Sequence, residues 1–542
     1  MDAITQVPAP VNEPPRPYSA GSADRAALEP ALKEIWGNRA ELHNWIDGRP
    51  VLGGGAVVEV VAPFEKSHVL GTFREATAED TAAAIAAAKK AAPGWAALSI
   101  DDRAAVLLKA ADLLTGSWRA VTNAATMLGQ AKTIYQAEID AVCELADFWR
   151  FNAHFARQIY AEQPAANSPG IWNRLDHRPL EGFVYAITPF NFTSIAANLA
   201  TAPALMGNTV VWKPSPTQAL SAEYTMKLLT AAGLPPGVIN LVHGAGPEVS
   251  SVALKDPDLA GIHFTGSTAT FQHLWAEVGA NITGYRSYPR IVGETGGKDF
   301  VLAHPSADLD VLRTALVRGA FEYSGQKCSA ASRAYVPASV WAGLKDDLAE
   351  TVRSLPVGAP TDFANFTSSV IDERAFAKHT AALKRAAEAE GIEVLVGGTT
   401  DDSVGYFVDP TVLIVDDPTD EALTTEYFGP ILAVHVFDDA DFDQIVAGIA
   451  DDSKYALTGA IIAQDRAAVA AVSERLRFAA GNFYVNDKPT GAVVGQQPFG
   501  GARASGTNDK AGAPQNLQRW TSTRSIKETF EPAVDWRYPH MG

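Results

Sequence analysis

Hydrophobic and polar positions follow two rhythms along this chain, which predict long helices first and then strands joined by helices. In the Ala-rich segment 78–160, apolar residues recur at helical spacing and predict several long helices. From residue 183 the rhythm changes, because short apolar runs such as FVYAIT (183–188) and TVVWKP (209–214) alternate with helical segments. A helix over about 193–206 is predicted to join these two strands.

The alternation continues to about residue 490 and predicts an α/β fold class. Strands at 238–244 and 261–266 extend the first series, and a second series begins near residue 294. The helices predicted in the second series lie at 308–323, 338–353 and 373–390. Short strands separated by helices imply parallel pairing with crossover connections, so we expect two open α/β domains. Open sheets of this kind bind ligands at the carboxyl ends of their strands.

Three flanking segments stand apart from these two domains. The Pro- and Ala-rich N-terminus predicts an extended arm, the stretch after the long helices reads as irregular or hairpin-like, and QRWTSTRSIKETF (518–530) predicts a terminal strand available for subunit pairing. The predicted division is an arm over 1–22, a first domain over 23–163 and 181–293, a second domain over 294–490, and a bridging or oligomerisation segment over 164–180 and 515–542.

Composition and charge narrow the class of protein. With 47% hydrophobic residues and a net charge of −18, the chain reads as globular and acidic, and an acidic surface repels nucleic acid. No apolar stretch is long enough to span a membrane, and the N-terminus lacks a secretory pattern. The two cysteines, Cys143 and Cys328, argue against a disulfide framework or a multi-cysteine metal site. We therefore expect a cytoplasmic protein without a metal.

Cys328 lies in the polar, glycine-containing segment YSGQKCSAAS (323–332). Such surroundings, with Lys327 adjacent, are expected to lower the pKa of the thiol below its ordinary value and to make it a nucleophile. A small buried core residue is the alternative, and local composition alone leaves the two interpretations equally open. Cys143 lies in the helical pattern AVCELADFWRF (141–151) and is predicted to belong to the core.

Two further polar residues lie where predicted strands end. Glu294, in GETGGKD (293–299), is placed to act as a general base if it is partly desolvated, although a solvated surface group is the commoner role of a glutamate. Asn191, in ITPFNFTS (187–194), could donate a hydrogen bond to a developing oxyanion. A helix-capping role is at least as plausible for Asn191 on local grounds.

Together these three segments resemble the aldehyde dehydrogenase superfamily, which carries a Pro-Phe-Asn turn, a Glu-Leu-Gly-Gly-Lys strand end and a nucleophilic cysteine after Gly-Gln, in this order. The separation 328 − 294 = 34 also fits, although Thr295 stands where the family usually has Leu. The resemblance runs from roughly residue 50 to the C-terminus. It implies a Rossmann-like cofactor domain, a catalytic domain and a small β flap for oligomerisation.

The resemblance implies a role for each of the three residues. Cys328 would attack the aldehyde carbon, and the Asn191 side chain with the Cys328 backbone N–H would hold the oxyanion. Hydride would pass to a nicotinamide, and Glu294 would activate the water that hydrolyses the resulting thioester. Relatives that transfer the acyl group to coenzyme A typically lack that glutamate.

A NAD site is implied in the same way. In the family, the lysine of WKPS (212–215) contacts the adenosine ribose, FTGST (264–268) binds the pyrophosphate at a helix N-terminus, and the glutamate of TEYFGP (425–430) holds the nicotinamide ribose. The cofactor-binding residues so implied are Thr188, Lys213, Gly266, Ser267, Thr268, Ala269, Thr270, Glu426 and Phe428. Pro216 replaces an acidic residue that often makes a ribose contact; NAD is still expected rather than NADP.

The run 481–512 resembles the glutamate-γ-semialdehyde dehydrogenase group of the superfamily, as do 137–156 and 325–333. In that group the substrate carboxylate meets a serine hydroxyl and two backbone N–H groups, while an aromatic ring packs on the aliphatic stem. The substrate-binding residues so implied are Lys327, Ser329, Gly491, Ala492, Phe499 and Glu144. Relatives often have Ser where Ala492 stands, which removes one hydroxyl contact.

The activity implied is NAD-dependent oxidation of L-glutamate γ-semialdehyde, in equilibrium with 1-pyrroline-5-carboxylate, to L-glutamate in proline catabolism. The chain has no residues left for a proline-oxidising barrel, so a separate proline dehydrogenase is expected as a transient partner. The family also implies a homo-oligomer, either a dimer or a multiple of dimers. The alternatives are a NAD- or NADP-dependent dehydrogenase of another semialdehyde, such as succinate semialdehyde, and a non-catalytic protein on the same fold.

Overall fold

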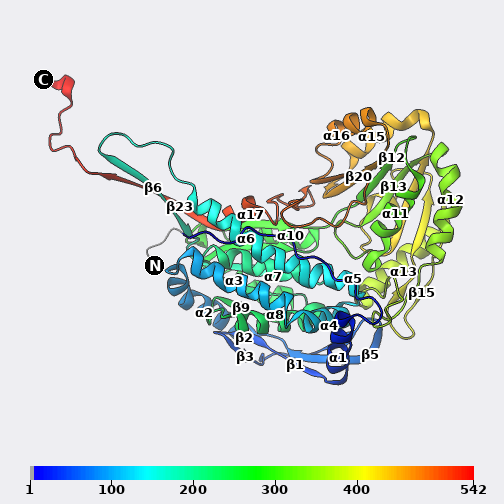
Figure 1. Cartoon of the computed structure of the whole chain (residues 1–542), viewed down its shortest axis with the longest axis horizontal. Coiled ribbons are helices and arrows are strands. Elements are labelled where there is room, and N and C mark those ends of the chain that lie inside the picture. The colour runs from blue at the N-terminus through cyan, green and yellow to red at the C-terminus, as the bar shows by residue number, and fades with distance from the viewer. Residues whose placement is uncertain (1–4) are drawn as a thin grey trace.

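The computed structural model describes residues 5–542, and two seven-stranded sheets organise it (Figure 1). Residues 1–4 of the predicted arm lie outside the described part. The arm residues from 5 to 22 form no helix or strand before α1 (Ala23–Gly37) begins at its N-cap, Ser22. Among residues 5–542 no helix combines the length and apolar character needed to cross a membrane.

The first sheet is parallel through five strands and ends in an antiparallel pair. Its strands, in spatial order, are β11 (Arg290–Glu294), β10 (Leu259–Thr265), β7 (Phe183–Ile187), β8 (Thr209–Lys213), β9 (Ile239–Leu241), β2 (Asn44–Ile46) and β3 (Arg49–Val51). The central strands are almost continuous apolar runs, as expected for parallel strands covered on both faces. The predicted strands over 183–188, 209–214 and 261–266 are thereby confirmed.

Helices cover both faces of this sheet. Alternate residues of β7 point in opposite directions, so that Val184 packs into one core and Tyr185 into the other. The helices on the Val184 side are α3 (Ile100–Thr115), α6 (Leu145–Ala161), α7 (Thr193–Leu205) and α8 (Ala219–Ala232). The helices on the Tyr185 side are α2 (Ala78–Ala96), α9 (Gly246–Ala253) and α10 (Thr268–Ala280).

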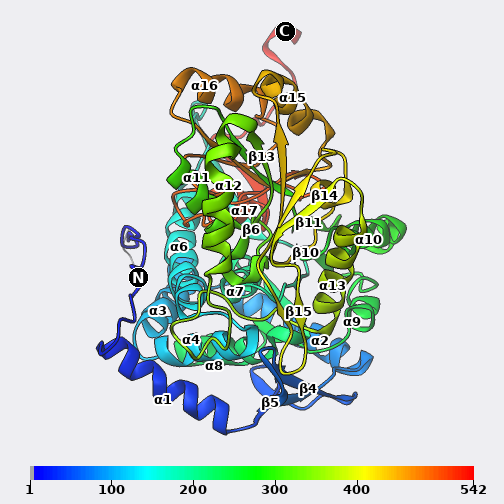
Figure 2. The same cartoon turned by 90° about the vertical axis from the view of Figure 1, so that its right-hand side faces the viewer.

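The second sheet is parallel except for one edge strand. Its strands, in spatial order, are β14 (Ile392–Val396), β17 (Thr411–Val415), β18 (Ile431–Phe437), β13 (Ala331–Pro337), β12 (Asp299–Ala303), β20 (Thr458–Ile462) and β21 (Asn482–Val485). Helices α11 (Leu309–Phe321) and α12 (Ala338–Arg353) pack on one face (Figure 2). Helices α15 (Phe442–Asp452) and α16 (Arg466–Arg475) pack on the other face.

The three helices predicted for the second series are confirmed as α11, α12 and α13 (Glu373–Glu388). The helical region 78–160 is less regular than predicted. Between α5 (Ile134–Ala137) and α6, residues Glu138–Glu144 form a π-helix, which follows α4 (Arg119–Gln130). In a π-helix the hydrogen bonds span five residues instead of the four of an α-helix, and such segments are frequent at functional sites.

A long two-stranded ribbon projects from the body, with the C-terminus beyond it (Figure 1). It pairs β6 (Ile171–Pro179) with β23 (Thr521–Thr529) in antiparallel register. The terminal strand predicted over 518–530 is confirmed, whereas the irregular or hairpin-like prediction for 164–180 is wrong over β6. The reason is that β6 finds its hydrogen-bond partner some 350 residues later in the chain, beyond the reach of any local pattern.

The remaining elements are short and mostly peripheral. A small sheet joins β1 (Ala40–Leu42), β5 (Glu65–Arg74) and β4 (Val57–Ala62) below the first sheet. The other pairs and helices are β15 (Thr400–Asp401) with β16 (Phe407–Val408), β19 (Tyr455–Ala456) with β22 (Ala502–Arg503), α14 (Glu421–Thr424) and α17 (Pro514–Gln518).

Candidate active site

The candidate catalytic residues come from both sheets and meet between them. Asn191 follows β7 and Glu294 ends β11, so both lie at the carboxyl ends of first-sheet strands, as predicted. Cys328 instead precedes β13, at the amino end of a strand in the second sheet. Within the second sheet, the segments before β12, β13 and β18 therefore supply the opposite wall of the site, which the carboxyl-end expectation did not foresee.

The backbone that presents Cys328 is constrained. Tyr323, Ser324 and Gly325 all have positive φ, at 52°, 50° and 65°, a conformation that side-chain-bearing residues seldom adopt. A Cβ on Gly325 would lie 2.3 Å from the carbonyl oxygen of Gly429, so only glycine fits there. The Thr367 hydroxyl accepts a hydrogen bond from the Ser324 backbone N–H at 2.8 Å. These contacts fix the turn that carries the nucleophile.

Cys328 itself is only partly buried, while its neighbours Lys327 and Ser329 are buried. The prediction that Lys327 lowers the pKa of the thiol is wrong. Burial raises the pKa of the Cys328 thiol well above its ordinary value, and the charges of Asp299, Glu426, Glu294 and Glu144 raise it further. Lys327 does not offset this effect, because its Nζ lies 2.8 Å from Glu322 Oε2 in a buried ion pair.

Cys143, the second cysteine, lies in the core as predicted. It is 6% exposed and is part of the π-helix, with its sulfur 3.8 Å from a carboxylate oxygen of Glu138. Burial is the largest cause of the raised pKa of its thiol. Exposure separates the two cysteines: Cys143 is enclosed in the core, whereas Cys328 is partly exposed and is therefore the candidate for a reactive thiol.

Asn191 lies against the nucleophile turn. Its side-chain Nδ2 donates to the carbonyl oxygen of Gln326 at 3.0 Å, which leaves the second N–H of the amide for another acceptor. The helix-capping alternative is wrong, because Asp140 of the π-helix accepts the backbone N–H groups of Thr193 and Ser194 at the start of α7. Among residues 5–542 the backbone N–H of Cys328 has no acceptor, so two donors remain for an oxyanion.

Glu294 is partly buried and faces the chain segment after β21. Its Oε2 accepts the backbone N–H of Gly501 at 2.8 Å. Burial raises the pKa of this carboxyl well above its ordinary value, although the hydrogen bond from Gly501 and the charge of Lys510 act in the opposite direction. A carboxylate with a raised pKa is suited to accept a proton near neutral pH. The charge of Glu294 also contributes to the raised pKa of the Cys328 thiol.

Thr295, which stands where the family usually has leucine, forms hydrogen bonds that satisfy its hydroxyl. The side chain is buried, and its hydroxyl donates to the carbonyl oxygen of Ala504 at 2.6 Å. The same hydroxyl accepts a hydrogen bond from the Thr268 hydroxyl at 3.1 Å. The polar group of Thr295 is thus fully paired, and the substitution for leucine leaves Glu294 in place.

The residues predicted for the adenosine end of the cofactor lie at adjacent strand ends. Thr188 follows β7, where its hydroxyl accepts the indole N–H of Trp212 at 2.9 Å and its backbone pairs with Lys213. Lys213 ends β8 and is 7% exposed, and burial lowers the pKa of its amine to about 8. The charge of Glu75 raises that pKa in part. The charge of Glu75 therefore acts on Lys213, and the sequence analysis did not identify this residue.

The residues predicted for the pyrophosphate form the first turn of α10. Ser267 is the N-cap, and its hydroxyl accepts the backbone N–H of Thr270 at 3.2 Å. The backbone N–H groups of Thr268 and Ala269 have no acceptor among residues 5–542. Gly266 links this turn to β11, because its backbone N–H donates to the Glu294 carbonyl oxygen at 3.2 Å. The turn offers free donors to an anion.

Glu426 and Phe428 close the site from the second sheet. The carboxylate of Glu426 accepts the Gly297 backbone N–H at 2.9 Å and lies so near Gly296 that a Cβ there would overlap it. Burial raises the pKa of this carboxyl. Phe428 has a positive φ of 60°, and its ring meets Phe190 from the other sheet edge to face at 5.8 Å.

The predicted substrate residues fall into two groups that meet beside Cys328. The Ser329 hydroxyl lies 2.7 Å from the hydroxyl of Thr490, which precedes Gly491 and Ala492 in the loop 486–501. Phe499, in the same loop, forms an isolated antiparallel bridge with Ala511. On the other side, the Ser194 hydroxyl donates to Glu144 at 2.6 Å, and burial raises the pKa of Glu144 to about 8. Lys327 is held in its buried ion pair with Glu322.

Several groups that shape the site were not predicted. They are Thr490, Glu322, Thr367, Glu75, and the buried pair of Lys132 and Asp140, whose charged atoms lie 2.6 Å apart. Thr490 lies inside the segment already singled out, so its position beside Gly491 was an available signal. Asp140 also lies in a segment already singled out, 137–156, but its role depends on a π-helix that brings it to the start of a helix 53 residues later, which no local pattern shows.

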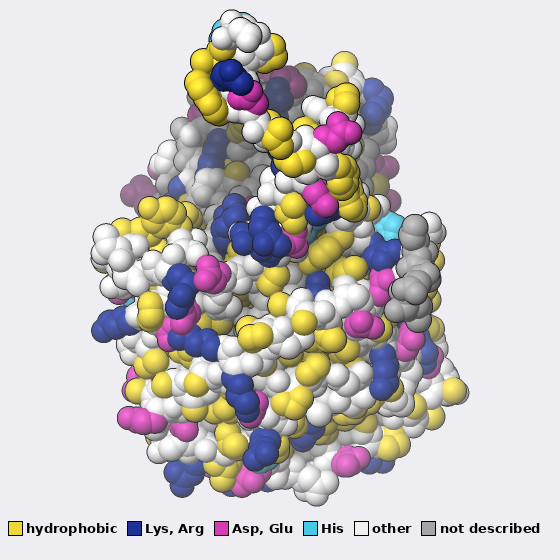
Figure 3. Space-filling view, turned by 90° about the vertical axis from the view of Figure 1, so that its left-hand side faces the viewer, with side chains coloured by type: hydrophobic (Ala, Val, Ile, Leu, Met, Phe, Trp, Pro, Cys, Tyr) yellow, Lys and Arg dark blue, Asp and Glu magenta, His cyan; other side chains and the backbone are white. Residues whose placement is uncertain are grey.

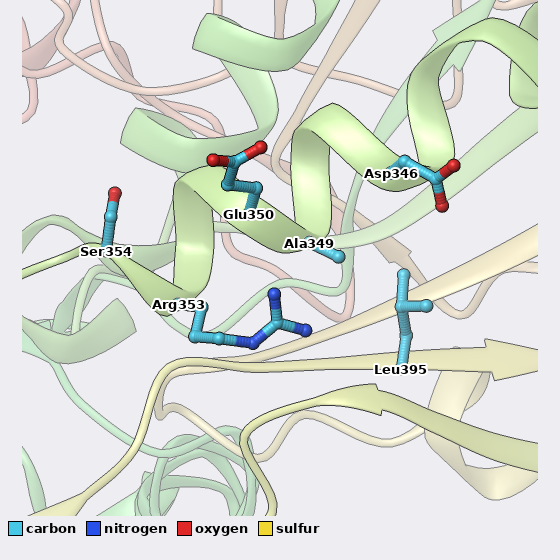
Figure 4. A pocket seen from close by; sticks show the side chains of 6 residues that line it. All are labelled: Asp346, Ala349, Glu350, Arg353, Ser354 and Leu395. Carbon is cyan, nitrogen blue, oxygen red and sulfur yellow. The ribbon is translucent and has the colours of Figure 1, made fainter.

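A wide groove elsewhere on the surface takes no part in this arrangement. It lies between α12 and β14 and has a volume of about 610 Å³ (Figure 4). It is lined by Asp346, Ala349, Glu350, Arg353, Ser354 and Leu395. None of the predicted catalytic, cofactor or substrate residues is among them, so the site between the sheets is the candidate active site.

Comparison with known proteins agrees with the geometry. A family model described as the aldehyde dehydrogenase family matches residues 52–526. The probable delta-1-pyrroline-5-carboxylate dehydrogenase of Schizosaccharomyces pombe is 50% identical over 98% of both chains. The bovine mitochondrial delta-1-pyrroline-5-carboxylate dehydrogenase is 48% identical over 98% of this chain and 94% of its own.

A solved structure extends the likeness to the fold. The delta-pyrroline-5-carboxylate dehydrogenase of Mycobacterium tuberculosis bound with NAD superposes with a TM-score of 0.97 at 62% identity, covering 100% of both chains. The whole described fold, including the projecting ribbon, therefore has a counterpart in that chain.

Proposed function

This chain belongs to the aldehyde dehydrogenase family, and we propose that it catalyses the NAD-dependent oxidation of L-glutamate γ-semialdehyde to L-glutamate. This is the second step of proline catabolism, whose substrate is in equilibrium with 1-pyrroline-5-carboxylate. One observation carries the substrate assignment. The buried hydroxyl of Ser329, directly after the nucleophile, is joined at 2.7 Å to the loop that presents Gly491 and Ala492. We propose that these groups together bind the carboxylate of the substrate.

The chemistry begins at Cys328. The thiol must lose its proton before it attacks the aldehyde carbon, because the thiolate is the nucleophile. The oxyanion that forms is held by the free N–H of the Asn191 amide and the backbone N–H of Cys328. After oxidation the acyl group remains on Cys328 as a thioester. Glu294 then takes a proton from the attacking water, and L-glutamate is released.

The chain fits NAD at three places. Lys213 presents a buried amine at the end of β8, the α10 turn presents unpaired backbone N–H groups, and Glu426 presents a carboxylate beside Gly297. When bound, NAD supplies the acceptor for the hydride that leaves the substrate carbon. The charge of Glu75, which acts on Lys213, supports NAD over NADP, since a carboxylate would repel a 2′-phosphate.

Steady-state assays with a panel of aldehydes test the proposed function. We expect kcat/KM for L-glutamate γ-semialdehyde with NAD to exceed that for succinate semialdehyde and for propanal by at least about 100-fold, because the latter two lack part or all of the amino-acid end. NADP should support a lower rate than NAD. Equal efficiency with succinate semialdehyde would assign the enzyme to that alternative, and no NADH formation with any aldehyde would favour a non-catalytic protein.

The Ser329→Ala variant provides the matched test of the carboxylate anchor within the same panel. Loss of one hydrogen bond to a charged group should raise KM for the amino-acid aldehyde by about 10- to 100-fold. The efficiency with propanal should change little, because propanal has no carboxylate to bind.

We further propose that the protein is a homo-oligomer built on the β6–β23 ribbon. The residues that follow the ribbon expose large apolar side chains with no cover, as the projecting segment in Figure 3 illustrates. They include Phe530, Val534, Trp536 and Tyr538, of which Val534 is 100% exposed. Large apolar side chains exposed together are typical of interaction surfaces, and a second copy that supplies a matching ribbon would cover them.

Substitution of this tail should weaken assembly. In the double variant Val534→Asp with Trp536→Asp, two charges would enter the apolar contact, and the dissociation constant of the oligomer should rise at least about tenfold. Multi-angle light scattering across a concentration series measures this change. Val404→Asp, at a similarly exposed valine in the loop between β15 and β16, is the matched control and should leave the mass unchanged. A monomeric wild-type protein would refute the proposal.

Two further expectations stay as proposals. The product of a proline-oxidising enzyme is the substrate proposed here, so a separate proline dehydrogenase is the partner for a transient contact.

The cytoplasm is proposed as the location because both cysteines are free thiols, as expected in a reducing compartment. Several similar proteins are named as mitochondrial, so fractionation of the source cells is the direct test.

A further inference from the structure

The N-terminal arm, residues 5–22, follows an unusual path for a segment without secondary structure. It runs along α6 toward α5 and α1, where Figure 1 shows it as a dark blue trace. It also lies before residue 52, where the match to the aldehyde dehydrogenase family model begins. The chemistry of the family as a whole therefore does not explain why this chain keeps an ordered arm.

Buried charges hold the middle of the arm in place. The carboxylate of Glu13 receives hydrogen bonds from Arg119 at 2.8 Å and from Arg150 at 2.9 Å. Arg119 also pairs with Glu138 of the π-helix, and the Tyr18 hydroxyl donates to Glu138 at 2.9 Å. Charge-assisted bonds in a buried setting are stronger than ordinary surface pairs. The arm is thus anchored at several points rather than draped over the surface.

Asn12 connects the anchored arm to the loop 486–501. Its Nδ2 donates to the carbonyl oxygen of Val494 at 2.8 Å and to Asp147 Oδ2 of α6 at 2.8 Å. Its Oδ1 accepts the side-chain amide of Gln496 at 2.9 Å. The next backbone N–H of the arm, at Glu13, donates to the other oxygen of Asp147 at 2.7 Å. One asparagine side chain therefore ties α6, the arm and the loop together.

The contacted part of the loop is close to the groups assigned to the substrate. Val494 and Gln496 lie between Gly491 and Phe499, and Thr490 joins the loop to Ser329. Gly495, with φ +79°, packs so closely on Phe151 of α6 that a Cβ would lie 2.1 Å from the ring. Within residues 5–542, the hydrogen bonds that reach residues 493–496 from outside the loop come from Asn12.

We propose that Asn12 is a positioning residue: through it, the N-terminal arm holds loop 486–501 in the geometry that binds the amino-acid end of the substrate. The inference rests on the proposed function and deepens it. Asn12 touches no reacting atom. It acts through the backbone of Val494, and hence on Gly491, Ala492 and Phe499, so it affects how well the amino-acid end is held and not the chemistry at Cys328.

Kinetics with two aldehydes test this role. In Asn12→Ala, KM for L-glutamate γ-semialdehyde should rise about tenfold while kcat stays within about twofold, because the loop must be ordered anew at each binding event. The kcat/KM for propanal, which has no amino-acid end, should not change. Val11→Ala, at the preceding and 74% exposed residue, is the matched control and should behave as wild type for both aldehydes. An equal loss for both aldehydes, or no loss for either, overturns the proposal.

The loop side of the contact provides a second variant. Gln496→Ala should raise the same KM, and the double variant with Asn12→Ala should be less than additive, because both changes break one shared contact. Fully additive effects would show that the two residues act independently and would refute the coupling.

Hydrogen–deuterium exchange separates this proposal from the proposed function. In Asn12→Ala, amides of residues 490–499 should exchange at least about fivefold faster than in wild type and in Val11→Ala, while those of β21 remain protected. This readout needs no substrate. If wild type shows no preference for the amino-acid aldehyde, the proposed function fails while the exchange result still decides the arm's role. Unchanged exchange would refute the positioning role.

Discussion

Replacing Cys328 with alanine is expected to reduce the rate of NADH formation at least about 10⁴-fold, to the limit of detection. Without the sulfur the substrate cannot become covalently bound as a thioester. Binding of NAD should be retained, because its proposed contacts at Lys213, the α10 turn and Glu426 do not involve the thiol. Steady-state assays and a titration with NAD followed by calorimetry measure the two effects.

The chain offers a matched control in its second cysteine. Cys143→Ala removes a thiol of the same kind from the π-helix core, where it takes no part in the proposed chemistry. Activity of Cys143→Ala should stay within about threefold of wild type once stability is allowed for by assay well below its melting temperature. If Cys328→Ala kept substantial activity, or if both variants lost it equally, the role of Cys328 as nucleophile would be disproved.

Replacing Glu294 with glutamine is expected to slow steady turnover by about 10²- to 10⁴-fold while leaving the first turnover largely intact. Glutamine cannot accept a proton from water, so the thioester on Cys328 should accumulate. A stopped-flow trace should therefore show a burst of NADH close to one equivalent per active site, followed by a slow phase. Mass spectrometry should find the acyl group attached to the trapped enzyme.

The pH dependence of thioester hydrolysis identifies the group that acts as the base. Burial raises the pKa of Glu294, and the base works only when deprotonated, so thioester hydrolysis in wild type should be present above that raised pKa and be lost as the pH falls through it. Glu294→Gln should lack this acid-side loss. Glu248→Gln, on the exposed surface of α9, should match wild type throughout. Steady turnover of Glu294→Gln at the wild-type rate would remove the assigned role.

The pKa of the Cys328 thiol is a property that neighbouring residues in the sequence did not predict correctly. The sequence places Lys327 beside Cys328, which suggests a stabilised thiolate. In the fold, Lys327 pairs with Glu322, and burial together with the charges of four carboxylates from distant segments raises the pKa of the thiol instead. Charge effects depend on distance in space, and adjacent residues on a chain often point in opposite directions.

The sequence alone determined the features that are written in short segments or in regular patterns. Apolar runs of strand length alternating with helical periods specified the α/β class and the helices α11, α12 and α13, because burial of a face imposes its period on the chain. Asn191, Glu294 and Cys328 were each ambiguous on local grounds, and they could be named because their three segments together, in this order and spacing, resemble the aldehyde dehydrogenase superfamily.

Only the tertiary structure decided which distant groups share one environment. Four such interactions join segments far apart in sequence. They are the pairing of β6 with β23, the capping of α7 by Asp140, the carboxylate charges that raise the pKa of the Cys328 thiol, and the hydrogen bond from Asn12 to Val494. The physical reason is that hydrogen bonds, desolvation and charge act over a few ångströms in space. A residue's partners across the fold leave no pattern in its own neighbourhood along the chain.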